Sequence, residues 1–417
     1  MQNVTQAWEE TNRSHFTRPA KVTLSFTLND GRVPLYSNSR IISFTFNKTG
    51  DPLSSILTQD TITFTLDNSD GRLNYDPETN DIYKNAFVMV WCSFMNEDYS
   101  AYDSIIGGKY YIAEVDMNAS QKRIQFTAKS ILAFMQAELD YTYNGNDTGH
   151  IQGTAYSVAQ TILAMAAADD GVPASEINSV LDSGIMNTIS VDFDSETDHY
   201  SMAQALQLIA NACGCVLFVD RNGYIHIEPI GDVSENYIIS GKICYDYPKL
   251  TYGEKIGRVR LEYDHGAGHA YTTRYAAKEG GTQIVTNPIL DDDFDALERA
   301  RAINEYFQTS RKKISGKFRA DPRIDLFDII VIPNGSKVST CCVTSLNMTI
   351  NGGWRGTYEA VEITTAILDL RIRDLEQLTI EQLESIRIEN LHPNTVSDIS
   401  GDYLACSDGS LVLWKGE

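Results

Sequence analysis

The sequence lacks the features that would place it in a membrane or outside the cell. It has no apolar run of about 18 residues, the length that crosses a bilayer as a helix. Residues 1–20 are polar and contain no apolar stretch of a signal peptide. The 7 cysteines are an odd number without framework spacing. We therefore expect no membrane span, no secretion, and buried free thiols in a protein that folds in a reducing cytoplasm.

Positive charge is also scarce. The chain has 34 Lys and Arg against 56 Asp and Glu, which gives a net charge of −22. Stable nucleic-acid binding needs Lys and Arg against the phosphates, so the composition argues against it. An acidic surface serves solubility, and it also suits a wall that nucleic acid passes without being captured.

Motifs for catalysis and metal binding are missing. None of the 7 histidines lies in a His-Glu-x-x-His pattern, and Cys-x-x-Cys, Gly-x-Ser-x-Gly and Walker sequences are absent. His265 and His269 are close in sequence, but the glycines between them favour a loop over a metal site. Carboxylates are plentiful, yet the sequence marks no two of them as an acid–base pair. We expect no catalytic residue, no cofactor and no metal ion.

Hydrophobic periodicity divides the chain into five predicted parts: an N-terminal arm (1–20), a first β domain (21–140), a middle α+β domain (141–252), a second β domain (253–368) and a C-terminal segment (369–417). The predicted strands of the first β domain are 21–28, 40–47, 61–67, 86–94, 109–118 and 122–129, before a short helix within 130–139. Those of the second are 258–264, 270–276, 314–319, 327–332, 340–350 and 358–365.

Helical periodicity is confined to three further segments. The middle part is predicted to form helices at Thr154–Ala168 and Ser201–Ala212, with Ser201 as the N-cap of the second. A strand, an Asp-Arg-Asn-Gly turn and a second strand follow within Cys215–Pro229. A third helix is predicted at Asp291–Thr309, with an apolar stripe of Ala296, Ala300, Ile303 and Phe307.

Three features of the β domains bear on function. The strands from Ala86 to Lys129 have a counterpart from Phe327 to Thr365, in which a strand, a strand ending near a Met, a turn and a strand recur; we interpret this as an internal duplication. Asp67-Asn-Ser-Asp-Gly71 resembles a calcium loop but lacks its first ligand and closing Glu, so we expect an Asx turn. Trp354, beside two glycines, is expected to form a contact at a hairpin tip rather than a sugar platform.

The C-terminal segment carries an eight-residue repeat. Its apolar positions are Leu370, Ile372, Leu375, Leu378, Ile380, Leu383, Ile386, Ile388 and Leu391. At about 100° per residue a helical stripe would drift by roughly 80° in each repeat, whereas the i, i+2 pairs share a face if the segment is extended. We favour a short triple-stranded β-helix that trimerises three chains; an amphipathic helix is the alternative. Two short strands, Tyr403–Cys406 and Leu411–Trp414, are expected after it.

Three motifs together resemble the baseplate or tail hub proteins of tailed phages and related contractile injection devices. They are the Leu-Asp-Asn-x-Asp-Gly-Arg turn at Leu66–Arg72, the Asp-Arg-Asn-Gly hairpin at Val219–Pro229, and the Arg-Ala-Asp-Pro run at Arg319–Val331. The resemblance covers roughly residues 20–365. It implies a mainly β fold with two related β-barrel-like tube domains and a middle α+β insert.

The resemblance also implies a function. A homotrimer with two tube domains per chain would adapt a sixfold tail tube to a threefold tip and line or close the path of the ejected DNA. Expected partners are the distal tail tube ring and other tail-tip or fibre proteins, with transient, non-specific passage of DNA, in a virion assembled in the bacterial cytoplasm. Two alternatives are a tail-tip adhesin, marked by exposed aromatics around Trp354 or Trp414, and a cell-wall hydrolase, marked by a cleft with paired acids.

Overall fold

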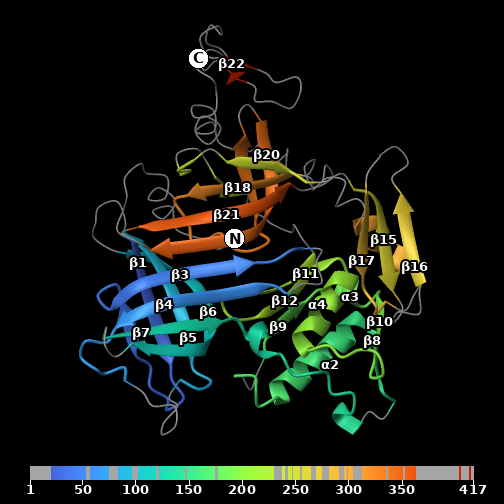
Figure 1. Ribbon diagram of the computed structural model, residues 1–417, viewed down its shortest axis with the longest axis horizontal. Helices are drawn as coiled ribbons and strands as arrows, with labels where there is room; N and C mark the ends of the chain where they lie inside the picture. Colours follow the sequence, from blue (N-terminus) through green and yellow to red (C-terminus); the bar gives the residue numbers. More distant parts are fainter. Residues whose placement is uncertain are drawn as a thin grey trace.

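The computed structural model describes residues 20–52, 57–74, 83–95, 102–118, 122–145, 148–173, 177–229, 237–239, 243–246, 248–253, 256–263, 269–274, 281–290, 295–297, 299–303, 312–334, 337–350, 353–362, 403–404 and 413–414 of the 417-residue chain. The described part is mainly β, with the helices gathered in one region beside a large sheet (Figure 1). The predicted mainly β class is therefore confirmed. No helix in these ranges is long and apolar enough to cross a membrane.

The N-terminal half of the large sheet is formed by seven strands that follow one another in sequence. They are β1 (Ala20–Thr27), β2 (Leu35–Ser37), β3 (Ile41–Thr49), β4 (Gln59–Asp67), β5 (Phe87–Met95), β6 (Tyr102–Asn118) and β7 (Arg123–Lys129). Burial alternates along β1 and β4, as expected for strands with one face in the core. The strands pair in the order β3-β4-β7-β6-β5-β1-β2.

The sheet of the N-terminal half is curled, so that distant strands face each other across one core. The ring of Phe26 on β1 contacts those of Phe64 on β4 and Phe126 on β7, with centroids 5.8 and 5.5 Å apart. β4 and β7 are hydrogen-bonded neighbours, but β6 and β5 lie between β7 and β1 in the sheet. The aromatic contacts therefore span the inside of a barrel-like curve.

The C-terminal half of the same 13-stranded sheet is built from strands far apart in sequence. They are β13 (Tyr237–Ile238), β14 (Lys249–Tyr252), β18 (Lys312–Phe318), β19 (Ile329–Asn334), β20 (Lys337–Ile350) and β21 (Trp354–Glu362). Their order is β14-β18-β21-β20, with β19 on β20 and β13 parallel to β19. In Figure 1 the orange strand β20 lies directly beside the blue strand β3.

The two halves share one strand order. β3-β4-β7-β6-β5 in the first half matches β14-β18-β21-β20-β19 in the second. Both long strands also carry a bulge against the following strand, between Ile112 and Glu114 on β6 and between Val343 and Ser345 on β20. Bulges are position-specific features of a sheet, so their agreement supports the duplication inferred from the sequence.

A second backbone feature recurs in both halves. Asn85 and Phe327 have φ of 58° and 63°, and each lies two residues before its strand, β5 and β19. Non-glycine residues rarely adopt positive φ, least of all a bulky residue such as Phe. The same unusual turn therefore leads into corresponding strands of both halves.

The middle region carries most of the helical structure. Its elements are η1 (Ile131–Phe134), η2 (Tyr143–Gly145), β8 (His150–Thr154), α2 (Ala155–Ala168), β9 (Ser179–Leu181), α3 (Ser183–Met186), β10 (Ser190–Asp194), α4 (Met202–Ala212), β11 (Cys215–Val219) and β12 (Ile225–Pro229). The predicted helices α2 and α4 and the hairpin β11–β12 are confirmed; the helix expected within 130–139 is the short 3-10 helix η1. Ser201 caps α4 in a reciprocal pair, since its hydroxyl accepts from Gln204 N and Gln204 Oε1 accepts from Ser201 N.

A smaller sheet packs on the middle region. It consists of β15 (Ile256–Tyr263), β16 (His269–Arg274) and β17 (Gly281–Thr286) in the order β16-β15-β17. Val259 and Leu261 belong to the same buried cluster as α2 and α4, and so do Ala296, Ala300 and Ile303 of the predicted third helix, which is helical at 295–297 and 299–303. The packing groups β15 and the helical residues 295–297 and 299–303 with the middle region. β14 belongs to the large sheet. The predicted domain boundary at 252/253 stays a prediction.

The C-terminal predictions fall almost entirely outside the described residues. All nine apolar positions of the repeat, from Leu370 to Leu391, are outside the described residues. The choice between a β-helix and a helix for this segment therefore stays open. The two short strands expected at the end are present as β22 (Tyr403–Leu404) and β23 (Leu413–Trp414), which pair antiparallel. The thiols of Cys92, Cys215, Cys341 and Cys342 are buried as expected, while Cys213 and Cys244 are half-buried.

Candidate functional site: the junction of the two sheet halves

The two halves of the large sheet join through backbone pairing. Thr45–Thr49 of β3 lies antiparallel to Ser345–Thr349 of β20, with Phe46 opposite Met348. Gly50 N extends the ladder by donating to Thr344 O at 2.9 Å. The junction is thus continuous sheet rather than a contact between separate surfaces.

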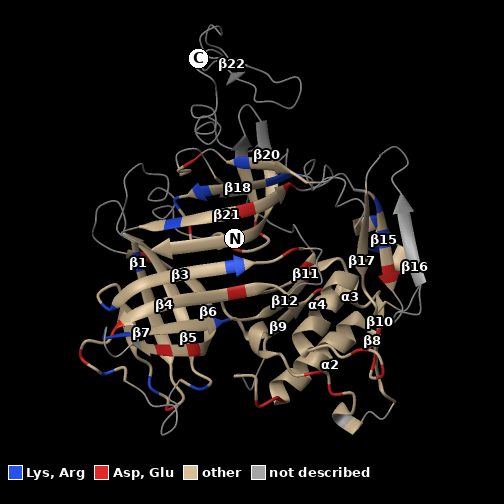
Figure 2. Cartoon of the chain, in the orientation of Figure 1, with Lys and Arg blue, Asp and Glu red and all other residues tan. Residues whose placement is uncertain are grey.

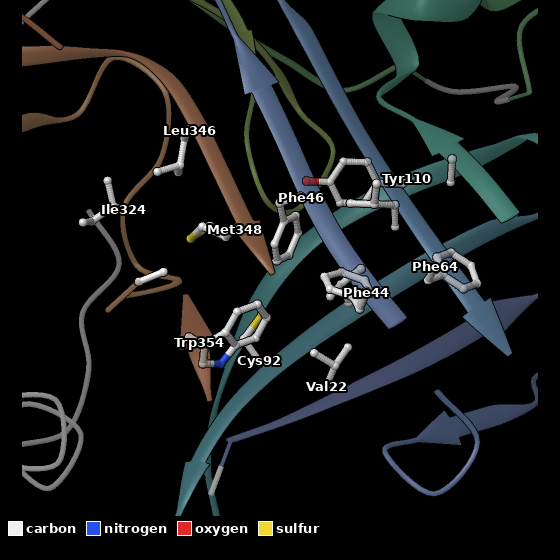
Figure 3. Packing of buried hydrophobic residues seen from close by; sticks show 14 of the residues in the cluster. Val22, Phe44, Phe46, Phe64, Cys92, Tyr110, Ile324, Leu346, Met348 and Trp354 are labelled. Carbon is white, nitrogen blue, oxygen red and sulfur yellow. The ribbon is translucent and has the colours of Figure 1, made fainter. Parts of the chain in front are cut away.

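Aromatic rings fill the core beneath this junction. Trp354 at the start of β21 is 1% exposed. Its ring stacks near Phe46, with centroids 6.0 Å apart, and meets Phe44 edge-on at 6.3 Å. Figure 3 shows Trp354 and Met348 facing Phe44 and Phe46 across the junction. Trp354 pairs with Ile350 at the end of the β20–β21 ladder, so the expected contact at a hairpin tip is confirmed. From that position its ring ties the C-terminal half to β3.

A buried ion cluster lies at the end of the junction. Lys48 continues the inward-facing row of β3 and is 3% exposed. Its Nζ lies 2.8 Å from Asp325 Oδ1 and 3.2 Å from Asp60 Oδ2, so it joins the loop before β19 to β4. Figure 2 shows basic β3 and acidic β4 positions side by side there.

The electrostatics of the cluster follow from burial and pairing. Burial raises the pKa of Asp60 to about 6, although the Lys48 ammonium opposes that shift. For Asp325, burial likewise raises the pKa, but Lys48 and Arg221 outweigh it and leave the pKa below its usual value. Lys48 keeps its charge, since the two carboxylates more than offset its burial and raise its pKa. The cluster therefore acts as a salt-bridged clamp.

Arg221 comes from the Asp-Arg-Asn-Gly turn that the sequence singled out. Its Nε lies 3.4 Å from Asp325 Oδ2, and its guanidinium donates to Ile106 O at 3.2 Å and Arg323 O at 2.6 Å. Asp220 shapes the turn by accepting hydrogen bonds from the two backbone N–H groups of residues 222 and 224. The turn thus connects the middle region to both halves of the sheet.

The other two motifs also stabilise loops around the sheet. In the Arg-Ala-Asp-Pro run, the buried carboxylate of Asp321 accepts from Arg323 Nε at 2.8 Å and from Arg323 N at 2.9 Å. In the turn after β4, Asp67 Oδ1 accepts from Ser69 N at 2.9 Å and Asp70 Oδ1 accepts from Arg72 N at 3.1 Å, and Gly71 has φ of 68°. The predicted Asx-type turn is therefore confirmed.

The imidazoles of His150 and His226 pair with carboxylates. His226 lies between two carboxylates, with Nδ1 3.1 Å from Glu228 Oε1 and Nε2 3.6 Å from Asp220 Oδ2. Burial opposes protonation, but hydrogen bonds with these carboxylates raise the pKa of His226. Within the described ranges no group of three or more His, Cys, Asp or Glu side chains is arranged to hold a metal ion.

Sequence reasoning missed the central residues of this junction. Lys48, Asp60 and Asp325 were not singled out, and the contact expected of Trp354 at its hairpin tip was not connected with β3. One signal was present: Lys48 continues the inward alternation of Phe44 and Phe46, and a lysine on the buried face of a strand needs a partner. The burial of Trp354 also removes it from the exposed aromatic cluster that the adhesin alternative required.

Comparison with known proteins connects this architecture to phage tails. No protein-family model matches the sequence, and no curated protein matches it. Among solved structures, a tail protein from Neisseria meningitidis MC58 superposes with a TM-score of 0.56 at 10% identity, covering 82% of this chain and 96% of that chain. The 43 kDa tail protein of prophage MuSo2 from Shewanella oneidensis has a TM-score of 0.52 at 10% identity, covering 82% and 98%. Prophage tail protein gp18 from Listeria monocytogenes EGD-e has a TM-score of 0.50 at 11% identity, covering 85% and 98%.

These similarities extend over nearly the full length of each tail protein. At such low identity they establish the fold alone, and that fold is the tail or baseplate hub type that the three sequence motifs resemble.

Proposed function

We propose that the protein is a structural hub of a phage tail tip or baseplate and has no enzymatic role. It acts as a homotrimer that adapts a sixfold tail tube to a threefold tip, and it forms part of the channel for DNA or its distal closure. The observation that carries this proposal is the repeated strand order, β3-β4-β7-β6-β5 and β14-β18-β21-β20-β19. Two similar units per chain allow three chains to present six similar units around one axis.

The charge and the rigidity of the chain support a channel role. With a net charge of −22, the protein repels phosphate, so DNA can pass without being retained. The buried clamp of Lys48, Asp60 and Asp325 holds the two halves of each chain in one arrangement. A ring that guides a tube and a tip needs such fixed geometry within each subunit.

The C-terminal repeat is the proposed element that holds the three chains together. Its positions Leu370, Ile372, Leu375, Leu378, Ile380, Leu383, Ile386, Ile388 and Leu391 would bury one apolar face against two other copies. The proposed further partners are the distal tail tube ring and other tail-tip or fibre proteins, within the virion.

Light scattering on the purified protein tests the trimer. We expect the mass of three 46.5 kDa chains. Leu375→Asp combined with Leu383→Asp should reduce this mass, whereas Glu376→Gln combined with Glu384→Gln, at neighbouring polar positions, should preserve it. A wild-type monomer over the micromolar range would contradict the proposal.

A further inference from the structure

Two open strand edges, on β14 and β6, are the counterparts of the two strands that form the internal junction. Among the described residues these two edges do not pair with each other. Inside the chain, Thr45–Thr49 of β3 pairs with Ser345–Thr349 of β20. In the repeated strand order, β14 is the counterpart of β3, and β6 is the counterpart of β20. Among the described residues, β14 pairs only with β18, and the last part of β6 pairs only with β7. Each chain therefore carries both strands of a second junction.

The bulges align β6 with β20 residue by residue. The bulge of β6 lies directly before Glu114, and the bulge of β20 lies directly before Ser345. Glu114–Asn118 therefore corresponds to Ser345–Thr349, the segment that β3 covers within the chain.

The same bulges align β14 with β3. Ala128 and Ala360 lie opposite the residue before each bulge. Following the pairing outward across β4 and β18 leads from these residues to Phe46 on β3 and to Leu250 on β14. Thr45–Thr49 therefore corresponds to Lys249–Gly253.

We propose that Lys249–Gly253 of one copy pairs antiparallel with Glu114–Asn118 of a second copy. The register of the internal junction places Leu250 opposite Met117 and Thr251 opposite Asp116. This inference rests on the proposed homotrimer for the number of copies, and it adds to that proposal the strands and the register through which neighbouring chains join.

Two side chains on the paired edges β3 and β20 are buried, whereas their counterparts on the open edges β14 and β6 are exposed. At the internal junction, Met348 is 2% exposed and Lys48 is 3% exposed. Their counterparts at the open edges, Met117 and Tyr252, are 38% and 67% exposed. Unpaired edge strands with apolar side chains are templates for pairing with another chain, so a second copy would restore the burial seen at the internal junction.

The faces of the two edges match in this register. Leu250 and Val115 both already pack against the core of the large sheet. The proposed pairing puts Leu250 and Tyr252 on one face with Met117 and Val115, and puts Lys249 and Thr251 on the other with Asp116 and Glu114. A one-residue slip would place apolar residues against acidic ones. Lys249 also lies diagonal to Asp116, within reach of a favourable charge pair.

The interface is directional, because each copy offers one β14 edge and one β6 edge. Such head-to-tail contacts form a ring when the rotation closes and a filament when it does not. With three copies the ring contains six similar sheet junctions, three within chains and three between them.

Cysteine cross-linking tests the register. The bond from Gly50 N to Thr344 O fixes which residue pairs of the junction are hydrogen-bonded. The alternation of the ladder makes Thr251 and Asp116 a non-hydrogen-bonded pair, with Cα atoms about 4.5 Å apart and within reach of a disulfide. A chain carrying Asp116→Cys and Thr251→Cys should form covalent trimers on oxidation. Both positions are exposed, so the variant should fold like the wild type.

Two controls define the result. Asp116→Cys with Tyr252→Cys places the thiols on opposite faces and should cross-link no more than the wild type, whose described cysteines are buried or half-buried. Co-expression of a chain carrying only Asp116→Cys with a chain carrying only Thr251→Cys should yield covalent dimers and no larger species.

The outcomes separate this inference from the proposed function. A trimer by light scattering without cross-links in the matched variant overturns the edge pairing and leaves the trimeric hub standing. A monomer overturns both. Equal cross-linking of the matched and off-register variants overturns the register, and with it the inference.

Discussion

Replacing Lys48 with methionine tests whether the ion cluster holds the two sheet halves together. The substitution keeps the length of the side chain but leaves Asp60 and Asp325 without the ammonium that lies 3.2 and 2.8 Å from them. Removing one partner of a buried ion pair costs about 3–5 kcal/mol, because a buried charge is left uncompensated. We expect Lys48→Met to lower the free energy of unfolding by about that amount near neutral pH.

The pH dependence of this loss gives a sharper signature. In the wild type, burial raises the pKa of Asp60 to about 6, so its burial penalty is full above that pH and is relieved as the pH falls towards 3.8. Without Lys48 the pKa of Asp60 rises further, and each unit is worth about 1.4 kcal/mol. The destabilisation should therefore be larger at about pH 8 than at about pH 5, where the carboxyl takes up a proton.

Urea unfolding at a fixed protein concentration measures both effects. Lys317→Met is the matched control, since Lys317 Nζ lies 3.8 Å from Asp246 in an exposed pair and should contribute no more than about 1 kcal/mol. A loss below about 1 kcal/mol for Lys48→Met, or an equal loss at both pH values, would refute the clamp.

Three further predictions concern the core and the hairpin. Trp354→Ala should lower the free energy of unfolding by about 3–5 kcal/mol in chemical denaturation; a cost equal to that of Trp91→Ala, on an exposed site, would contradict its place under the junction. Gly356→Ala should cost about 1–3 kcal/mol, since a Cβ there would lie 2.6 Å from Asn347 O; an unchanged melting temperature would contradict this. His226 has a raised pKa, so its stabilisation is full below pH 6.5 and is lost as the pH rises through the folded value. His226→Gln should therefore destabilise more at low pH than at high pH in thermal unfolding, and a uniform effect would show that the carboxylates are not its partners.

Local periodicity made much of the β structure predictable. Alternating burial along β1 and β4 follows from alternating residue types in the sequence. The capping box of α4 was signalled by Ser201 before an apolar stripe. The short strands β9 and β13 escaped prediction because runs of two or three residues carry no period.

Long-range pairing was beyond local patterns. Lys48 and Asp325 are 277 positions apart, and no spacing rule connects them. The strand order of the second half was hidden for the same reason, since β14 and β18 are separated by the whole small sheet β15–β17. Sequence repetition suggested that two similar halves exist, but only the fold showed that β3 and β20 join them.

The motifs that resembled a tail hub turned out to be structural. Arg221 and Asp321 stabilise the loops that hold the middle region and the sheet halves together. A few buried polar contacts constrain these loops.

The most direct test of the hub is the symmetry of the tail region that contains this chain, measured by cryo-electron microscopy of assembled particles. Three copies around one axis are predicted, with β14 of each copy beside β6 of the next and the C-terminal repeats meeting on the axis. Six or twelve copies at that level, or C-terminal repeats that face solvent singly, would contradict the account.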